Sequence, residues 1–224
     1  MRLKLVFGPD TKEYSKEDTY GALASLLLKR NPRRTLIDAM SSTENYLSDL
    51  AAMVYREYPG RLGGQSVVQT DSPAQFEKML SLILSSADKG EMIERLVEER
   101  VREIFYGNPA DFFLKDKAKL GFGDFFKDAK IKPLLDSFVE ATSRRNIVVH
   151  NAGRVDRKYM REVKNTQFRL GQAVSIPGDY LRATIANLEC LAAAATNLVI
   201  TQVCQESAKG KLGDSLKKFN ARIS

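Results

Sequence analysis

The sequence is poor in the side chains that most often hold transition metals. Its 224 residues include one histidine, His150, and two cysteines, Cys190 and Cys204. Because a zinc site of the usual kind draws several ligands from these residue types, we expect no metal ion. One chain also lacks a pair of histidines for acid–base catalysis. A second histidine would have to come from a second copy of the chain.

Three further kinds of signal are missing. The sequence contains neither a Gly-x-x-x-x-Gly-Lys loop nor a Gly-x-Gly-x-x-Gly turn, so nothing supports a nucleotide cofactor, and we predict no cofactor. Two cysteines are too few for a disulfide framework, and on one helix they would lie about 21 Å apart. The charged start, Met1–Phe7, does not resemble an export signal. These absences predict a cytoplasmic protein.

Positive charge is what the sequence has in excess. Its net charge is +7, while 43% hydrophobic and 28% charged residues are ordinary for a globular protein that buries a core. This length allows one large or two small domains. A basic balance favours polyanionic partners, of which nucleic acid comes first and an anionic membrane surface second.

Apolar residues recur mainly at helical spacing, which predicts an all-α fold with at most minor extended pieces. A short strand is expected at 3–7 and another extended piece near 172–176. The expected helices cover 20–29, which Asn31-Pro32 should end, and then 36–54, a segment from Ser72, 91–106, 132–150 and 179–207. A membrane span at 179–207 is the weaker alternative, because polar residues interrupt it.

The pattern divides the chain into three parts. Residues 1–60 are expected to form a helical extension packed on the core, residues 72–207 the main helical domain, and residues 208–224 a basic, flexible tail. A segment rich in phenylalanine lies inside the main domain, where the rings could stack on bases or pack in the core. We favour the core for these residues: Phe112, Phe113, Phe122, Phe125 and Phe126.

One predicted helix carries an unusual polar string. It opens at Lys132-Pro133 and should end near Gly153. Continuing its apolar face at about 100° per residue places Arg145 and Asn146 inward and Arg144 outward. His150 then lies about 40° from Asn146 but about 140° from Arg145. A bent helix, the long arginine stem or a second copy of the chain could bring them together.

Ordinary roles exist for each of these residues. Arg145 could extend to the surface, Asn146 could satisfy a loop carbonyl, and a lone histidine is commonly without function. The string as a whole favours a different interpretation.

Arg145-Asn146-Ile147-Val148-Val149-His150 resembles the Arg-x4–6-His signature of the HEPN superfamily of helical nucleotide-binding domains. The continuation 151–156 and the helix end at 104–109 are also similar to this family, and the resemblance covers about 72–207. It implies a HEPN-like helical bundle that dimerises, so that Arg and His of both copies meet in one cleft. It further implies a metal-independent endoribonuclease, used as a toxin or as an effector of antiviral defence, and an antitoxin or defence-system partner.

The resemblance also assigns roles. His150 would transfer protons during attack of a ribose 2′-hydroxyl on the adjacent phosphodiester, Arg145 would stabilise the transition state, and Asn146 would orient the phosphate or the imidazole. Residues that could contact the RNA are Arg144, Asn151, Arg154, Arg157 and Lys158. A subgroup of the family carries a tyrosine two residues after the histidine; this chain has Ala152 there, so regulation through that tyrosine is not expected.

Two other interpretations stay open at this point. The chain could be a non-catalytic HEPN-like module that binds RNA, a nucleotide or a protein, in which case its basic residues would matter more than His150. It could also be a structural helical protein in which the string is coincidental.

Overall fold

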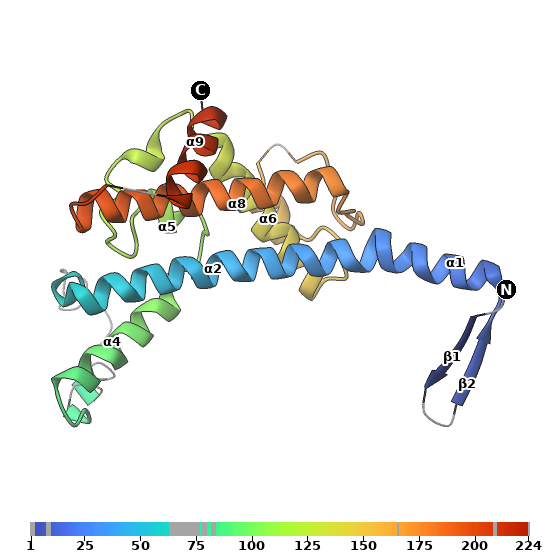
Figure 1. Cartoon of the computed structure of the whole chain (residues 1–224), viewed down its shortest axis with the longest axis horizontal. Coiled ribbons are helices and arrows are strands. Elements are labelled where there is room, and N and C mark those ends of the chain that lie inside the picture. The colour runs from blue at the N-terminus through green and yellow to red at the C-terminus, as the bar shows by residue number, and fades with distance from the viewer. Residues whose placement is uncertain are drawn as a thin grey trace. The chain divides into compact units, whose positions relative to one another are not determined.

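The computed structural model describes residues 3–7, 10–62, 77, 80, 81, 84–164, 166–207 and 210–223. Helices dominate these parts of the chain, and the all-α fold predicted from apolar spacing is confirmed (Figure 1). The helix expected to begin at Ser72 lies largely outside the described residues. The HEPN-like character of the bundle stays a prediction.

A small antiparallel hairpin begins the chain. Strand β1 (Leu3–Phe7) pairs with β2 (Asp10–Tyr14), with Leu3 opposite Tyr14 and Phe7 opposite Asp10. The strand expected at 3–7 is therefore confirmed, whereas its partner was not expected.

The predicted helix break at Asn31-Pro32 is wrong. Helix α1 (Lys16–Ser25) continues through a π-helical turn, η1 (Leu26–Arg30), into α2 (Asn31–Glu57). In that turn the Asn31 N–H donates to the carbonyl of Leu26, which shifts the hydrogen-bond pattern just before Pro32. Pro32 then occupies the second position of α2, where its missing N–H and its ring are tolerated.

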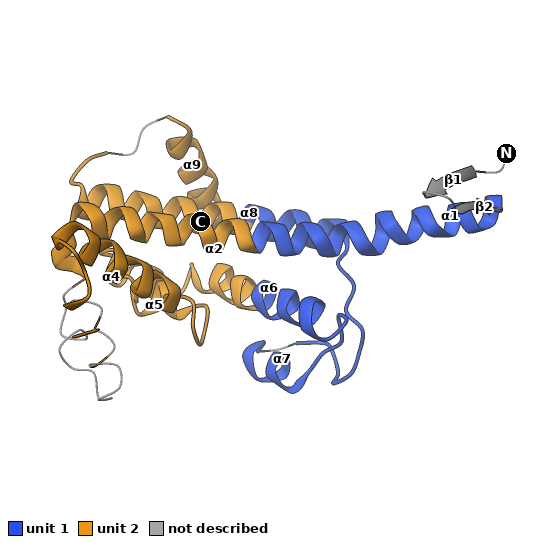
Figure 2. Cartoon of the chain, turned by 90° about the horizontal axis from the view of Figure 1, so that it is seen from below, with its two compact units in different colours: residues 1–40, 140–186 blue, residues 41–139, 187–224 orange. Residues whose placement is uncertain are grey.

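The described chain divides into two compact units, coloured separately in Figure 2. Unit 1 comprises residues 1–40 and 140–186, and unit 2 comprises residues 41–139 and 187–224. These limits differ from the predicted domain limits at 60 and 72, because α2, α6 (Lys132–His150) and α8 (Gly178–Leu198) each contribute to both units. That residues 1–60 pack on the core stays a prediction; α1 and η1 bury no residue.

Phenylalanine rings form much of the interior of unit 2. Most of them lie in the connection that contains the short helices α5 (Asp111–Leu114) and η3 (Phe125–Lys127). This connection follows helix α4 (Lys89–Glu103), and the short turn η2 (Pro59–Arg61) comes earlier in the chain. The rings of Phe112 and Phe113 lie 4.9 Å apart in an edge contact, and Phe113 and Phe126 lie 4.8 Å apart. The predicted core role is confirmed for the four buried rings, Phe112, Phe113, Phe122 and Phe126.

The predicted flexible tail is instead helix α9 (Lys211–Ile223). Its Phe219 is buried and stacks on Phe125, with ring centroids 5.9 Å apart. Lys218 donates to Glu189 of α8 at 3.2 Å. Glycines and lysines made this segment look loose, but four apolar residues recur at helical spacing within it: Leu212, Leu216, Phe219 and Ile223.

The expected long helix near the C-terminus is present as α8 and its π-helical continuation η4 (Val199–Val203). Together they are long and apolar enough to cross a membrane, by length and composition alone. Half of the apolar window is buried within the protein, and core helices of soluble proteins pass the same test. From the sequence we predict that the chain binds no membrane, and this stays a prediction.

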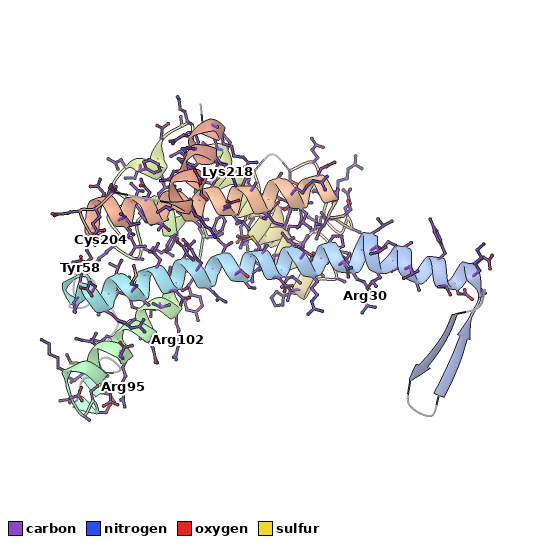
Figure 3. The ribbon with its side chains drawn as sticks, in the orientation of Figure 1. Arg30, Tyr58, Arg95, Arg102, Cys204 and Lys218 are labelled. Carbon is purple, nitrogen blue, oxygen red and sulfur yellow. The ribbon has the colours of Figure 1, made fainter. Side chains whose placement is uncertain are left out.

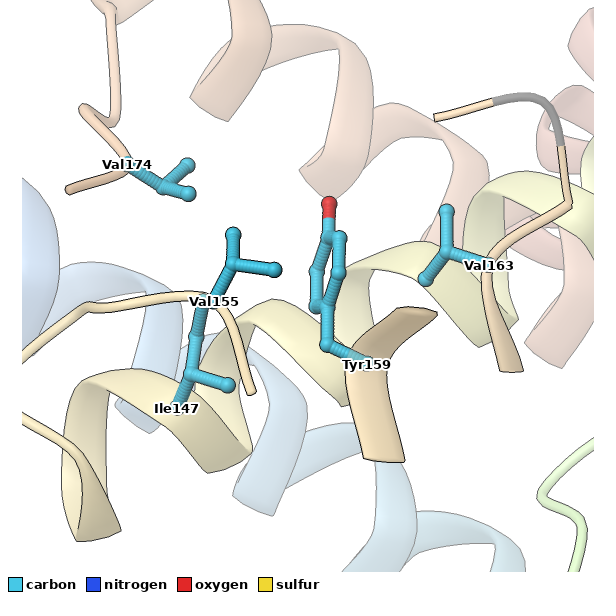
Figure 4. Packing of buried hydrophobic residues seen from close by; sticks show 5 residues of the cluster. All are labelled: Ile147, Val155, Tyr159, Val163 and Val174. Carbon is cyan, nitrogen blue, oxygen red and sulfur yellow. The ribbon is translucent and has the colours of Figure 1, made fainter. Parts of the chain in front are cut away.

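In unit 1 a small hydrophobic cluster lies against the last turns of α6. Short helix α7 (Arg157–Glu162) supplies Tyr159, and the neighbouring loops supply most of the other side chains. Figure 4 shows the cluster: Ile147, Val155, Tyr159, Val163 and Val174. The extended piece expected near 172–176 appears as a β-bridge between Arg154 and Ala173. The chain that follows α6 therefore folds back beside it.

Candidate active site

The polar string ends an unbroken helix. Helix α6 runs from Lys132 to His150, as the sequence predicted. Beyond it, Ala152 and Gly153 have φ angles of 50° and 78°, and the Gly153 N–H donates to the Ile147 carbonyl at 2.8 Å. This left-handed turn ends the helix and confirms the role expected of Gly153. His150 is thus the last helical residue.

An arginine from the N-terminal segment lies on this turn. A Cβ atom added to Gly153 would lie 2.9 Å from Nη2 of Arg33 and 3.3 Å from its Cζ. The guanidinium therefore sits at the C-terminal end of α6, where unpaired carbonyls favour a positive charge. Sequence reasoning missed Arg33, because it is far from the motif in sequence and lies between the helices that were expected at 20–29 and 36–54.

We expect Gly153→Ala to lower the free energy of unfolding by about 1–2 kcal/mol, because alanine is strained at a positive φ. The added methyl group must also displace the Arg33 guanidinium. Gly171 is the matched control, since its φ is 77° and nothing lies within 4 Å of the added atom. Chemical denaturation of both variants should show the larger loss for Gly153→Ala. Equal losses would mean that Arg33 moves aside at no cost.

The three proposed catalytic residues differ in exposure. Arg145 and Asn146 are half-buried, and the Nε atom of Arg145 is shielded from solvent. His150 is exposed, and within the described chain no hydrogen bond or ion pair involves its imidazole. Because α6 is a regular α-helix up to His150, Arg145 and His150 project about 140° apart. A bend of the helix does not bring them together.

Arg144 does not point away from the protein, contrary to the prediction. Its side chain is buried, Nε donates to Oε1 of Glu140 at 2.7 Å, and Nη1 donates to the Ser175 carbonyl at 3.0 Å. The guanidinium carbon also lies 3.9 Å from the ring centroid of Tyr180. The chain that folds back after α6 covers this side of the helix, which a helical wheel does not reveal. Arg144 is not available to contact RNA.

Glu140 is the centre of this buried network. Its Oε1 accepts a hydrogen bond from the Tyr159 hydroxyl and its Oε2 accepts one from the Tyr180 hydroxyl, each at 2.7 Å. Burial and then the negative charge of Glu140 raise the pKa of Tyr159 to about 12, and the same two causes raise the pKa of Tyr180. Both tyrosines therefore stay protonated as donors at neutral pH.

A second side-chain hydrogen bond lies one turn further along α6. The Ser143 hydroxyl donates to Oε2 of Glu162 in α7 at 2.8 Å. Together with the Glu140 network, it fixes the C-terminal half of α6 against residues 156–180. Helix α6 is thus held by polar contacts on the side that carries Arg144, which the sequence had predicted to point away from the protein.

The remaining proposed RNA contacts lie on the surface of unit 1. Asn151, Arg154, Arg157 and Lys158 are all exposed. Asn151 donates from Nδ2 to the Arg154 carbonyl at 2.7 Å, so its side chain also holds the turn after His150. The same segment exposes three further cations that sequence reasoning left out: Arg161, Lys164 and Arg169. The density of basic residues over 154–169 could have indicated them.

The described residues include no group of three His, Cys, Asp or Glu side chains that could hold a metal ion. Action without a metal or another cofactor stays a prediction. No protein-family model matches the chain, and neither a curated protein nor a solved structure was found to be similar to it.

Proposed function

We propose that this protein is a metal-independent endoribonuclease of HEPN type that acts as a homodimer. The observation that carries the proposal is the placing of Arg145, Asn146 and His150 in the last turns of one regular helix, with the imidazole exposed. Histidine is the side chain whose ordinary pKa best suits proton transfer near neutral pH. Its position leaves the ring accessible to a substrate.

The proposed reaction is internal transesterification. The ribose 2′-oxygen attacks the adjacent phosphorus, the bond from phosphorus to the 5′-oxygen breaks, and the products carry a 2′,3′-cyclic phosphate and a 5′-hydroxyl. One imidazole accepts the proton from the 2′-hydroxyl, and a protonated imidazole supplies a proton to the leaving oxygen. Arg145 stabilises the charge on the pentacoordinate phosphorus, and Asn146 orients the phosphate or an imidazole.

A second copy of the chain supports this chemistry in two ways. It supplies the second histidine, which this chain lacks. It also places a second His150 where Arg145 could act with it, because Arg145 projects about 140° away from His150 of its own helix. A two-fold axis near the end of α6 would duplicate all three residues around one site.

The exposed residues Asn151, Arg154, Arg157 and Lys158 are proposed to contact the RNA backbone, and Arg161, Lys164 and Arg169 extend the same basic segment. A toxin or antiviral role in the cytoplasm, restrained by an antitoxin or a defence-system partner, remains part of the proposal.

We expect purified protein to cut single-stranded RNA in the presence of EDTA and to leave 2′,3′-cyclic phosphate ends. The matched control is the same oligonucleotide with 2′-deoxyribose at the cleaved positions, which should resist because the nucleophile is missing. Gel analysis of end-labelled substrates measures both. Cleavage of the deoxy substrate would contradict the mechanism, and binding without turnover would favour the non-catalytic module.

A further inference from the structure

The N-terminal helical segment exposes several large apolar side chains. Tyr20, Leu23, Leu27 and Leu28 are 76%, 51%, 60% and 74% exposed. No residue of α1 or η1 is buried. Arg30 marks the end of this segment in Figure 3. Isolated apolar side chains are common on protein surfaces, but a group on one short segment indicates an interaction surface.

Most of these residues share one face. At about 100° per residue, Tyr20, Leu23 and Ala24 of α1 fall within an arc of about 100°. Leu27 and Leu28 follow in the π-helical turn, four residues after Leu23 and Ala24. Such an arc has the width of the apolar stripe by which a helix packs against another element. Gly21 and Ala24 would allow another helix to come close, since nothing lies within 4 Å of a Cβ built at Gly21.

The two ends of this segment carry opposite charges. Glu17 and Asp18 outweigh Lys16 in the first turn of α1, and Lys29 and Arg30 lie in the last turn of η1. An antiparallel copy of the same segment would place acidic ends beside basic ends, whereas a parallel copy would place like charges together. The segment is therefore complementary to itself in one orientation.

We propose that α1 and η1 form a two-fold, antiparallel contact with the same segment of a second copy of the chain. The axis passes near Ala24, so Tyr20 packs against Leu28 of the second copy and Asp18 lies near its Arg30. A two-fold contact uses the same patch on both copies, which fits the symmetric arrangement of apolar centre and charged ends.

An anionic membrane fits this face less well than a second copy of the chain does. Helices that lie on such membranes are usually rich in Lys and Arg along the polar side. Here the first turn has a net negative charge, because Glu17 and Asp18 outweigh Lys16, and an anionic surface repels that net charge.

This contact is separate from the proposed active site and does not depend on it. Arg33 lies on the turn after His150. With an axis near Ala24, the two copies of Arg33 would be about 27 Å apart along the helix direction. The contact therefore does not bring two His150 residues together. Loss of this association and loss of RNA cleavage are distinguishable results.

The first test is the mass of the full chain by sedimentation velocity over a range of concentrations. Leu27→Glu should raise the dissociation constant by about 100-fold or more and halve the mass at micromolar concentration, because each copy then buries a charge. Leu170→Glu is the matched control, since Leu170 is 59% exposed and lies outside this segment. Its mass should equal that of the wild type.

The second test locates the axis by cysteine cross-linking in a chain whose Cys190 and Cys204 are replaced by serine. Ala24→Cys should form a disulfide-linked dimer on oxidation, whereas Asn31→Cys on the same face should not. Equal cross-linking of both variants would indicate a parallel contact and overturn the proposal. A mass unchanged by Leu27→Glu, or a monomeric wild type that binds anionic vesicles instead, would overturn it as well.

Discussion

Replacing His150 with alanine is expected to lower the rate constant of RNA cleavage by about a thousandfold or more. General acid–base catalysis by one positioned side chain contributes about 10²–10⁴-fold, and in a two-fold site the change removes both imidazoles. The ring at the end of α6 is exposed, so its removal should leave the described fold intact. Single-turnover cleavage of an end-labelled RNA, with enzyme in excess over substrate, measures the effect on chemistry without product release.

Arg154 provides the matched control for His150. It is exposed, it also follows the end of α6, and its Nη1 donates only to the Gly171 carbonyl, at 3.2 Å. Arg154→Ala should weaken RNA binding and reduce the salt dependence of that binding. The single-turnover rate constant at saturating enzyme should stay within about threefold of the wild-type value. Arg145→Ala should instead lower that rate, as His150→Ala does. Full activity of both Arg145→Ala and His150→Ala would falsify the proposed site.

The features of α6 that could be predicted are those set by its own sequence. Lys132-Pro133 begins the helix and Gly153 ends it, because proline fits a first helical turn and glycine fits a left-handed cap without strain. These preferences depend on a few neighbouring residues. The helix limits were therefore confirmed although nothing was known of the packing around them.

The side of α6 that Arg144 occupies could not be predicted in the same way. The apolar residues early in the helix define one buried face, but Ser175 and Tyr180 cover a second side near its end. A contact between residues 31 or more positions apart leaves no periodic pattern in either segment. Arg33 was missed for the same reason, since only the folded chain brings it to Gly153.

Two other errors arose from giving residue types too much weight. Pro32 was expected to end a helix, yet a π-helical turn adapts the hydrogen bonds before it. The glycines and lysines after 208 suggested a tail, although apolar spacing from Leu212 to Ile223 favoured a helix. In α9 the packing of Phe219 outweighed the preference of single residues, whereas at Pro32 the local hydrogen-bond pattern of the helix adapted.

Glu140→Leu is expected to lower the free energy of unfolding by about 3–5 kcal/mol, the usual cost of removing one partner from a buried ion pair. The side chains of Arg144 and Glu140 are only 8% and 19% exposed. The substitution leaves the Arg144 guanidinium without its carboxylate and removes the acceptor of two tyrosine hydroxyls. Urea denaturation followed by circular dichroism measures the loss.

The same helix contains the control for this prediction. Lys132 and Asp136 have the same spacing of four residues, but their side chains are 67% and 60% exposed. Asp136→Asn should therefore change stability by about 0.5 kcal/mol or less. Replacing Glu140 and Arg144 together, by leucine and methionine, should restore much of the loss, because no buried charge is then left alone. If the double variant were as unstable as Glu140→Leu, the tyrosine hydroxyls, not the arginine, would dominate the network. A folded double variant that still cleaves RNA would further separate the support of α6 from the chemistry proposed for His150.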